Sequence, residues 1–171
     1  GGDTVSVGGV ELEVGDDGIV AFAAYPGSYE VAAPSSQWMQ AVAEPLVVHY
    51  GFGSSDVQVE PTPALATEVE RQVREVLDSC ASSTKLDDAD CPFDAWAFRE
   101  VRNVAWTVDS YPEIELSADG SWFDSTDTGT ATATWEEKDY AGEWEAKTYS
   151  DRFYLWGEVD VDGDTVAVSL D

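Results

Sequence analysis

Pro63-Ala-Leu-Ala-Thr-Glu-Val-Glu-Arg-Gln-Val-Arg-Glu-Val-Leu-Asp-Ser-Cys80 is the segment around which the rest of this chain is organised. Apolar residues recur in it at helical spacing and form one stripe, with Leu77 beside it: Leu65, Val69, Val73, Val76 and Cys80. Thr62 is suited to cap the helix, and Pro63 to its first position, because the missing N–H would be unpaired there anyway. We therefore predict one amphipathic helix over residues 63–79 that buries its stripe on a sheet.

Cys80 and Cys91 are the only cysteines in the chain. The first ends the predicted helix, and the second, in Cys91-Pro92-Phe93, opens the segment that leads to a sheet. A lone pair so placed predicts one structural disulfide and an oxidising compartment outside the cytoplasm. A redox-active pair is the alternative, but ten intervening residues do not resemble Cys-x-x-Cys. A zinc site is disfavoured because the one histidine, His49, lies in the other half of the chain.

The charge of the chain is strongly negative. Its 171 residues include 35 acidic and 8 basic ones, which gives a net charge of −27 at pH 7. Such a surface repels nucleic acid and anionic lipid, since binding phosphates depends on lysine and arginine displacing counterions. A solvated surface that keeps a secreted protein soluble, or a protein adapted to high salt, explains the acidity. Binding of a cationic partner is the functional alternative.

Short alternating segments separated by turn signals fill the first part of the chain and predict a small antiparallel β-sandwich over residues 1–60. The expected strands lie at residues 10–14, 19–24, 29–31, 46–50 and 57–59. Residues 34–45 contain two prolines and few strand signals, so we expect a loop there. Pro61-Thr62-Pro63 marks the boundary with the second part.

Residues 61–171 are predicted to form the helix and an antiparallel sheet. Val104, Trp106 and Val108 alternate until Tyr111-Pro112 interrupts the strand pattern. Further alternating segments follow, and Asp162-Gly163 gives the strongest hairpin signal in the chain. One helix followed by four or five long antiparallel strands predicts the α+β class.

Three tryptophans in this second part are the candidate ligand-binding residues: Trp135, Trp144 and Trp156. They lie among several glutamates, and aromatic faces beside carboxylates are suited to stacking a sugar or holding a cation. The alternative is that they are core residues beneath the helix. A deep cavity between helix and sheet, lined by tryptophan and carboxylates, would favour ligand binding, whereas a filled core would favour an interaction module.

Catalytic and metal motifs are weak. No P-loop, dinucleotide fingerprint or nucleophile elbow is present, so we expect no catalytic residues, no cofactor and no hydrolase activity. Asp160, Asp162 and Asp164 have the alternate spacing of a calcium loop, and Asp171 falls at its twelfth position. Glycine stands at the fourth position of that loop rather than the sixth, and strand patterns flank it, so a solvated hairpin turn is the better interpretation.

The chain resembles a group of uncharacterised membrane-anchored extracytoplasmic proteins of actinobacteria. The matching pieces are Tyr25-Pro26-Gly27-Ser28-Tyr29, Leu77-Asp-Ser-Cys80-Ala-Ser-Ser-Thr84, Cys91-Pro92-Phe93, and Trp106 with Tyr111-Pro112. The second part also looks like a cystatin-like or nuclear-transport-factor-like α+β fold. The resemblance implies one transmembrane helix upstream and an extracytoplasmic position, and it brings no activity and no catalytic residues.

These observations lead to two expectations of function. The first is the extracytoplasmic domain of a membrane-anchored envelope protein, with a non-enzymatic interaction or structural role toward a protein or cell-envelope component. The second is a small-ligand or glycan binder that uses the concave face of the second sheet. We expect any secretion signal or anchor to lie upstream of Gly1, since no apolar stretch here approaches the roughly 20 residues that span a bilayer.

Overall fold

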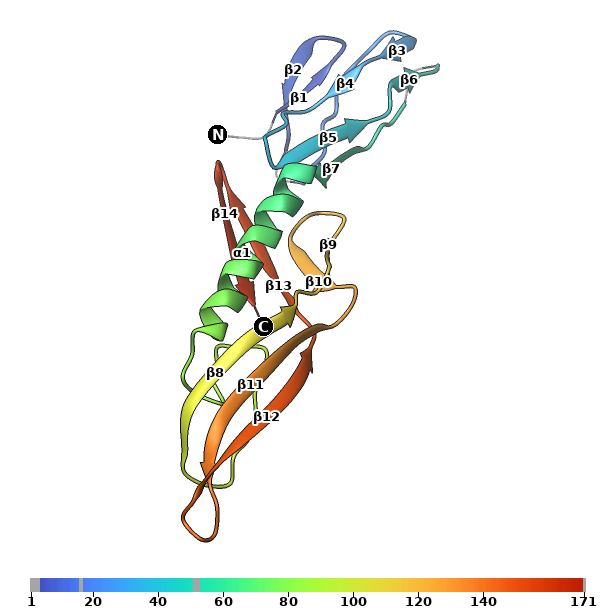
Figure 1. Ribbon diagram of the computed structural model, residues 1–171. Helices are drawn as coiled ribbons and strands as arrows, with labels where there is room; N and C mark the ends of the chain where they lie inside the picture. Colours follow the sequence, from blue (N-terminus) through green and yellow to red (C-terminus); the bar gives the residue numbers. More distant parts are fainter. Residues whose placement is uncertain (1–3, 16, 51–52, 171) are drawn as a thin grey trace. The chain divides into compact units, whose positions relative to one another are not determined.

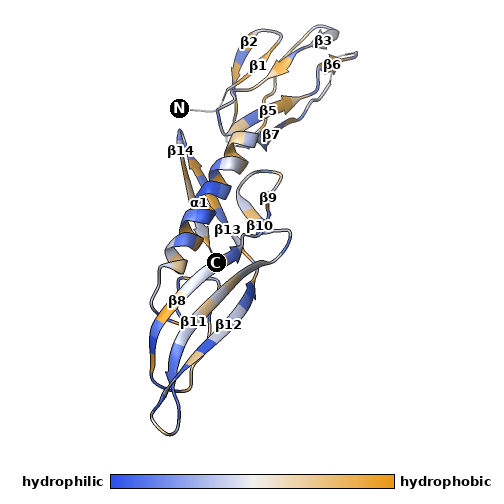
Figure 2. Cartoon of the chain, in the orientation of Figure 1, coloured by the Kyte–Doolittle hydropathy of each residue, from blue (hydrophilic) through white to orange (hydrophobic). Residues whose placement is uncertain are grey.

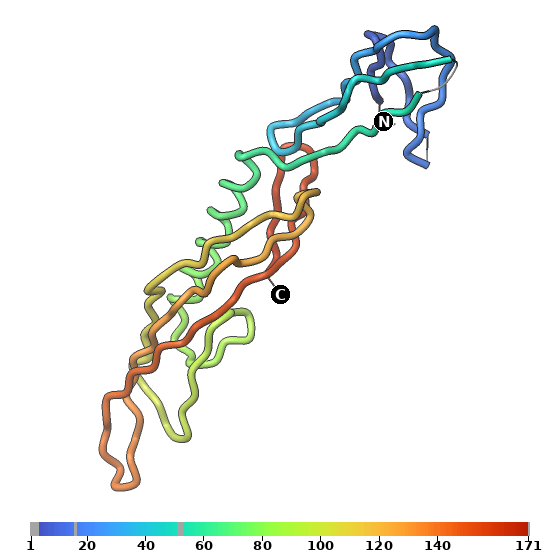
Figure 3. The backbone as a smooth tube through the Cα atoms, turned by 90° about the vertical axis from the view of Figure 1, so that its right-hand side faces the viewer, coloured from blue at the N-terminus to red at the C-terminus, as the bar shows by residue number. Residues whose placement is uncertain are grey.

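The computed structural model describes residues 4–15, 17–50 and 53–170. The chain forms two compact units, residues 1–65 and 66–171. Figure 1 shows their helices and strands, and Figure 3 follows the same backbone from another side. Strand pairing is antiparallel in every sheet of the described chain, and one helix accompanies these sheets. The fold therefore belongs to the α+β or mostly-β class.

Small sheets make up the first unit. Its strands are β1 (Thr4–Val7), β2 (Val10–Glu13), β3 (Gly27–Tyr29), β4 (Val31–Ala32), β5 (Met39–Ala43), β6 (Leu46–Val48) and β7 (Val57–Pro61). They pair in the orders β2-β1-β4, β3-β6 and β5-β7. Val7, Leu46 and Val48 form a buried cluster, and partly buried apolar residues pack against it: Leu12, Ala24, Tyr29 and Val31.

Two predictions for this unit were wrong. Residues 19–24 form no strand, and their large apolar side chains are not packed, since Ile19 is 64% and Phe22 41% exposed. Residues 34–45 are not all loop, because Met39–Ala43 pairs with Val57–Pro61 along its whole length. The two prolines that suggested a loop, Pro34 and Pro45, both lie outside that strand.

The helix α1 (Pro63–Ala81) starts at the predicted proline and ends two residues beyond the predicted Ser79. The Leu65 amide contacts both the Thr62 carbonyl, at 3.0 Å, and the Thr62 hydroxyl, at 3.4 Å, so Thr62 caps the helix as expected. Hydrophobic and hydrophilic residues alternate in colour along α1 in Figure 2. The buried stripe is Leu65, Val69, Val73, Leu77 and Cys80. Leu77, predicted to lie beside the stripe, is therefore part of it, and Val76, predicted to be part of it, is only half-buried.

Seven strands follow α1 in the described residues: β8 (Val101–Ser110), β9 (Ile114–Leu116), β10 (Trp122–Ser125), β11 (Gly129–Lys138), β12 (Trp144–Phe153), β13 (Trp156–Asp162) and β14 (Thr165–Leu170). They form two sheets, with the orders β12-β11-β8 and β14-β13-β10-β9. A short break separates β8 from β9, β10 from β11 and β12 from β13, and the two strands of each pair lie in different sheets. Tyr111-Pro112 is one such break, between β8 and β9, because proline has no N–H to donate to a ladder.

The core of the second unit lies on the inward faces of these strands. Ala131, Ala133 and Trp135 alternate inward along β11, and Phe123 and Leu155 are fully buried. The ring of Phe93, from the segment after the helix, lies 4.9 Å from the ring of Trp106 and 5.3 Å from that of Phe153, centroid to centroid. Helix and sheet are also joined by Gln72, whose side chain donates to the Val166 carbonyl at 2.8 Å.

The predicted disulfide is present between Cys80 and Cys91. It ties the end of α1 to a coil that adds Leu86, Phe93 and Ala95 to the core. Within this coil the Lys85 carbonyl accepts a hydrogen bond from the Trp106 indole at 2.8 Å, and the Ala95 amide donates to the Leu86 carbonyl at 2.8 Å. The bridge therefore holds the coil that closes one side of the core.

Candidate functional site

The three predicted ligand-binding tryptophans do not meet in one place. Trp135 is 7% exposed and points into the core. Trp144 stands opposite Lys138 in the β11–β12 ladder. Lys138 is three positions from Trp135 along β11, and side chains at an odd separation point to opposite faces, so Trp144 and Trp135 lie on opposite faces of that sheet. Trp156 lies in the second sheet, on β13, and is 56% exposed. Binding of a ligand by any of them stays a prediction.

Trp144 and Trp135 differ in their partners. The Arg102 guanidinium lies 4.1 Å and the Lys138 amine 5.5 Å from the ring centroid of Trp144. Arg102 also donates to Glu136 at 2.7 Å and lowers the pKa of that carboxyl, with help from Asn103. The buried indole N–H of Trp135 has no hydrogen-bond partner among the described residues. Trp144 therefore belongs to a paired surface network, and Trp135 to the core.

Trp156 has a neighbour that sequence reasoning missed as a site residue. Trp122, on β10, is 50% exposed and stands directly opposite Glu158 in the ladder. Asp124 stands opposite Trp156 in the same ladder, and Glu115 opposite Asp124. Residues directly opposite in a ladder share a face, so the two tryptophans lie diagonally beside each other.

We call this surface the Trp122–Trp156 face; it consists of the outward residues Glu115, Trp122, Asp124, Trp156, Glu158, Asp160 and Asp162. A shallow depression of about 580 Å³ lies on it, lined by Ser121, Trp122, Glu158, Val159, Asp160, Ala167, Val168 and Ser169. The opposite face of the same strands is core, because Phe123, Val159 and Val166 are buried there. The sheet thus presents its outer face without a covering element from its own unit.

The charges on this face are all of one sign. Its five carboxylates make no hydrogen bond or ion pair with any other described residue: Glu115, Asp124, Glu158, Asp160 and Asp162. Strands β9, β10, β13 and β14 contain no lysine, arginine or histidine. The face therefore offers aromatic surface surrounded by uncompensated negative charge.

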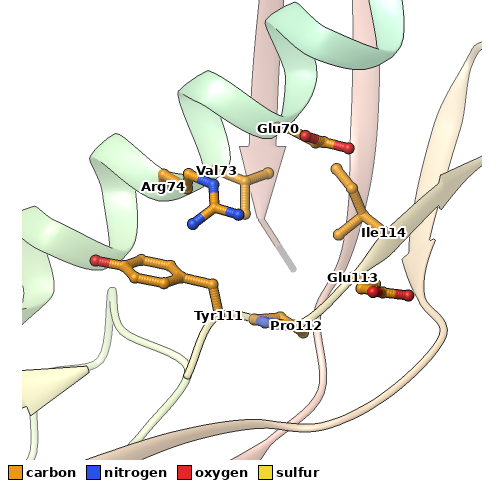
Figure 4. A pocket seen from close by; sticks show the side chains of 7 residues that line it. All are labelled: Glu70, Val73, Arg74, Tyr111, Pro112, Glu113 and Ile114. Carbon is orange, nitrogen blue, oxygen red and sulfur yellow. The ribbon is translucent and has the colours of Figure 1, made fainter. Parts of the chain in front are cut away.

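A second hollow lies between α1 and the break at Tyr111-Pro112, as Figure 4 shows. It has a volume of about 330 Å³ and is lined by Glu70, Val73, Arg74, Tyr111, Pro112, Glu113 and Ile114. The Arg74 guanidinium lies 4.6 Å from the ring centroid of Tyr111. The Tyr111 hydroxyl donates to Asp78, and this hydrogen bond raises the pKa of Tyr111.

This hollow matches only in part the tryptophan-lined helix–sheet cavity that would favour a ligand binder. Carboxylates line it, but no tryptophan does. Deeper between helix and sheet, the space is filled by fully buried side chains, among them Leu77, Phe123 and Leu155. The charged groups that line it are the guanidinium of Arg74 and the carboxylates of Glu70 and Glu113.

The remaining candidate residues lie in ordinary surface positions. Asp160, Asp162 and Asp164 are exposed at the β13–β14 hairpin, where Gly163 has a φ of +59° that suits glycine at a tight turn. Asp171 lies outside the described residues. Within residues 4–15, 17–50 and 53–170, no three His, Cys, Asp or Glu side chains are grouped to hold a metal ion. His49 is exposed at the end of β6.

Comparison with protein-family models, with curated protein sequences and with solved structures found no match to this chain. In the described part of the chain, no helix combines the length and the apolar character needed to span a membrane.

Proposed function

We propose that this chain is a non-enzymatic interaction module whose binding surface is the Trp122–Trp156 face. The observation that carries the proposal is the pair of half-exposed tryptophans on the outer face of one sheet. Each tryptophan side chain can bury some 150–250 Å² in a contact, and tryptophan is enriched among the residues that dominate binding energy. Trp122 and Trp156 are diagonal neighbours in the ladder and together form one aromatic surface, so we infer that a partner covers them.

We further propose that the module works outside the cytoplasm, as the domain of a membrane-anchored envelope protein. The disulfide supports this position, because such bonds persist in oxidising compartments. The helix is followed by three runs of strand, β8–β9, β10–β11 and β12–β13, that each pass from one antiparallel sheet to the other, and this supports a cystatin-like arrangement of the second unit. The membrane anchor is proposed from the resemblance of the chain to membrane-anchored extracytoplasmic proteins of actinobacteria.

Variants of the exposed tryptophans test the proposed surface. The double variant Trp122→Ala/Trp156→Ala is titrated beside the unaltered protein with cell-wall fragments, neutral oligosaccharides, and peptides of either charge, and heat of binding is recorded. At least one probe class is expected to bind saturably. The double variant should weaken that binding by about 100-fold, which corresponds to about 3 kcal/mol for two central aromatic residues.

The matched control is Trp96→Ala, which removes a tryptophan that is more exposed, at 75%, but lies in the coil after the disulfide. It should leave binding unchanged. Equal loss in the control and in the double variant, or binding that survives in the double variant, would rule out the Trp122–Trp156 face as the binding surface.

A small-ligand binder is the second candidate, and the hollow beside Arg74 is the observation that favours it. The lining has one guanidinium, of Arg74, and two carboxylates, of Glu70 and Glu113, so the ligand expected there carries both a carboxylate for Arg74 and an amine for the glutamates. In the same titrations, Arg74→Gln should abolish binding of such a ligand, whereas Trp122→Ala/Trp156→Ala should not affect it.

A further inference from the structure

We infer that the partner of the Trp122–Trp156 face is an extended polypeptide segment that carries arginine or lysine at alternate positions. The inference rests on the proposed function and adds the chemical class of the partner. It is drawn from the spacing of the side chains on β13, from the sign of the charge, and from the two aromatic rings.

The spacing of the partner's side chains is inferred from the strand β13. Along β13 the outward residues are Trp156, Glu158, Asp160 and Asp162, and the residues between them point inward. Alternate residues of a strand are about 7 Å apart, because each residue advances the chain by about 3.3 Å. An extended partner chain repeats its own side chains at the same interval. Its alternate residues can therefore meet one aromatic ring and three carboxylates in succession.

The negative charge of the Trp122–Trp156 face determines which side chains the partner segment carries. Five carboxylates of this face lack partners among the described residues, and the four strands contain no cation. A neutral partner would remove water from these carboxylates without replacing its hydrogen bonds, which is unfavourable. Arginine or lysine replaces those hydrogen bonds with charge-assisted ones.

The two indole rings also favour a partner that carries arginine or lysine. A guanidinium or ammonium over an indole face is attracted by the ring, and arginine also stacks on it. Trp122 and Trp156 stand beside Glu158 and Asp124 in the ladder, so one cation can contact a ring and a carboxylate together. Such a combined contact favours arginine over lysine.

The partner segment does not come from residues 1–171 themselves. The chain has only 8 basic residues, and they do not alternate in any segment. A second copy carries the same net charge of −27 and is repelled. A neutral glycan remains an outcome of the test below, because sugars also stack on tryptophan.

The test uses a synthetic peptide in which arginine and serine alternate, and a control peptide with citrulline, the neutral isostere, in place of each arginine. Binding is followed by tryptophan fluorescence and by calorimetry in about 150 mM NaCl, where the Debye length is about 8 Å. The arginine peptide is expected to bind saturably, and the citrulline peptide at least about tenfold more weakly.

Two double variants separate local recognition from the field of the whole protein. Glu158→Gln/Asp160→Asn neutralises two carboxylates of the face, and Asp87→Asn/Glu143→Gln neutralises two exposed carboxylates elsewhere in the second unit. Both remove two negative charges and keep the side-chain shape. Glu158→Gln/Asp160→Asn should weaken binding of the arginine peptide by about fivefold to tenfold, and Asp87→Asn/Glu143→Gln by less than about twofold.

Four results would overturn the inference. Equal weakening in the two double variants would mean that the peptide senses only the diffuse charge. Equal binding of the citrulline peptide would mean that charge is not recognised. If a neutral oligosaccharide binds and the arginine peptide does not, and Trp122→Ala/Trp156→Ala abolishes that binding, the binding surface stands and its partner class is wrong. Peptide binding that persists in Trp122→Ala/Trp156→Ala would overturn both the inference and the proposed function.

Discussion

Replacing Phe123 with alanine is expected to lower the free energy of unfolding by about 3–5 kcal/mol, the range for a large aromatic residue removed from a packed core. The Phe123 side chain is fully buried on β10, between Leu116 on one neighbouring strand and Gly157 on the other. A Cβ at Gly157 would lie 2.8 Å from the Phe123 ring, so the ring fills the space that this glycine leaves. The alanine variant leaves a cavity that the two strands cannot close without shifting. Urea unfolding, followed by circular dichroism, measures the change.

The adjacent residue provides the control. Trp122 precedes Phe123 on the same strand and points to the opposite, exposed face. Trp122→Ala should therefore cost under about 1 kcal/mol, as surface substitutions do. If the two variants were equally destabilised, the face assigned to water would be part of the core, and the proposed binding surface would not exist.

Removing the disulfide is expected to lower the free energy of unfolding by about 3 kcal/mol, the chain-entropy value for a loop of this length. The two cysteines are 11 residues apart in the sequence. The double variant Cys80→Ala/Cys91→Ala frees the coil that contributes Leu86, Phe93 and Ala95 to the core and holds the Trp106 indole through the Lys85 carbonyl. The stability loss should be seen in urea unfolding, and the Trp106 fluorescence should move toward longer wavelength.

Thiol counting checks the same bridge directly. Mass spectrometry of the intact, non-reduced protein after alkylation should show no modified cysteine. An alkylated cysteine in the folded protein, or a double variant as stable as the parent, would contradict a structural disulfide.

The sequence predicted correctly those helices and strand breaks that depend only on residues close together in the chain. Thr62, Pro63 and the spacing of Leu65, Val69 and Val73 are sufficient to place α1, because capping and helical periodicity involve near neighbours. The Tyr111-Pro112 break follows from the missing proline N–H. Residues 19–24 look like a strand for the same local reasons, but a strand also needs a partner strand and a surface on which to bury its apolar side chains, and no local pattern shows that Ile19 and Phe22 stay exposed.

The candidate site was less predictable because it depends on strand register. The alternation of Trp156, Glu158 and Asp160 with Gly157 and Val159 does show that Trp156 lies on the polar side of its strand. The pairing of Trp122 with Glu158 joins residues far apart in the sequence, and register is set by the packing of the whole sheet. Trp135 and Trp144 look equivalent in the sequence, yet their odd separation across the β11–β12 ladder puts them on opposite faces.

The indole N–H signals in a proton–nitrogen correlation spectrum report directly which tryptophans meet the partner. The chain has 7 tryptophans, and single Trp→Phe variants assign their signals. On addition of the alternating arginine–serine peptide, the signals of Trp122 and Trp156 are expected to shift together with one saturation curve. Those of the buried Trp106 and Trp135 and of the exposed Trp96 should stay in place. Shifts confined to Trp96 or Trp144, with Trp122 and Trp156 unmoved while the peptide binds, would contradict binding at the Trp122–Trp156 face.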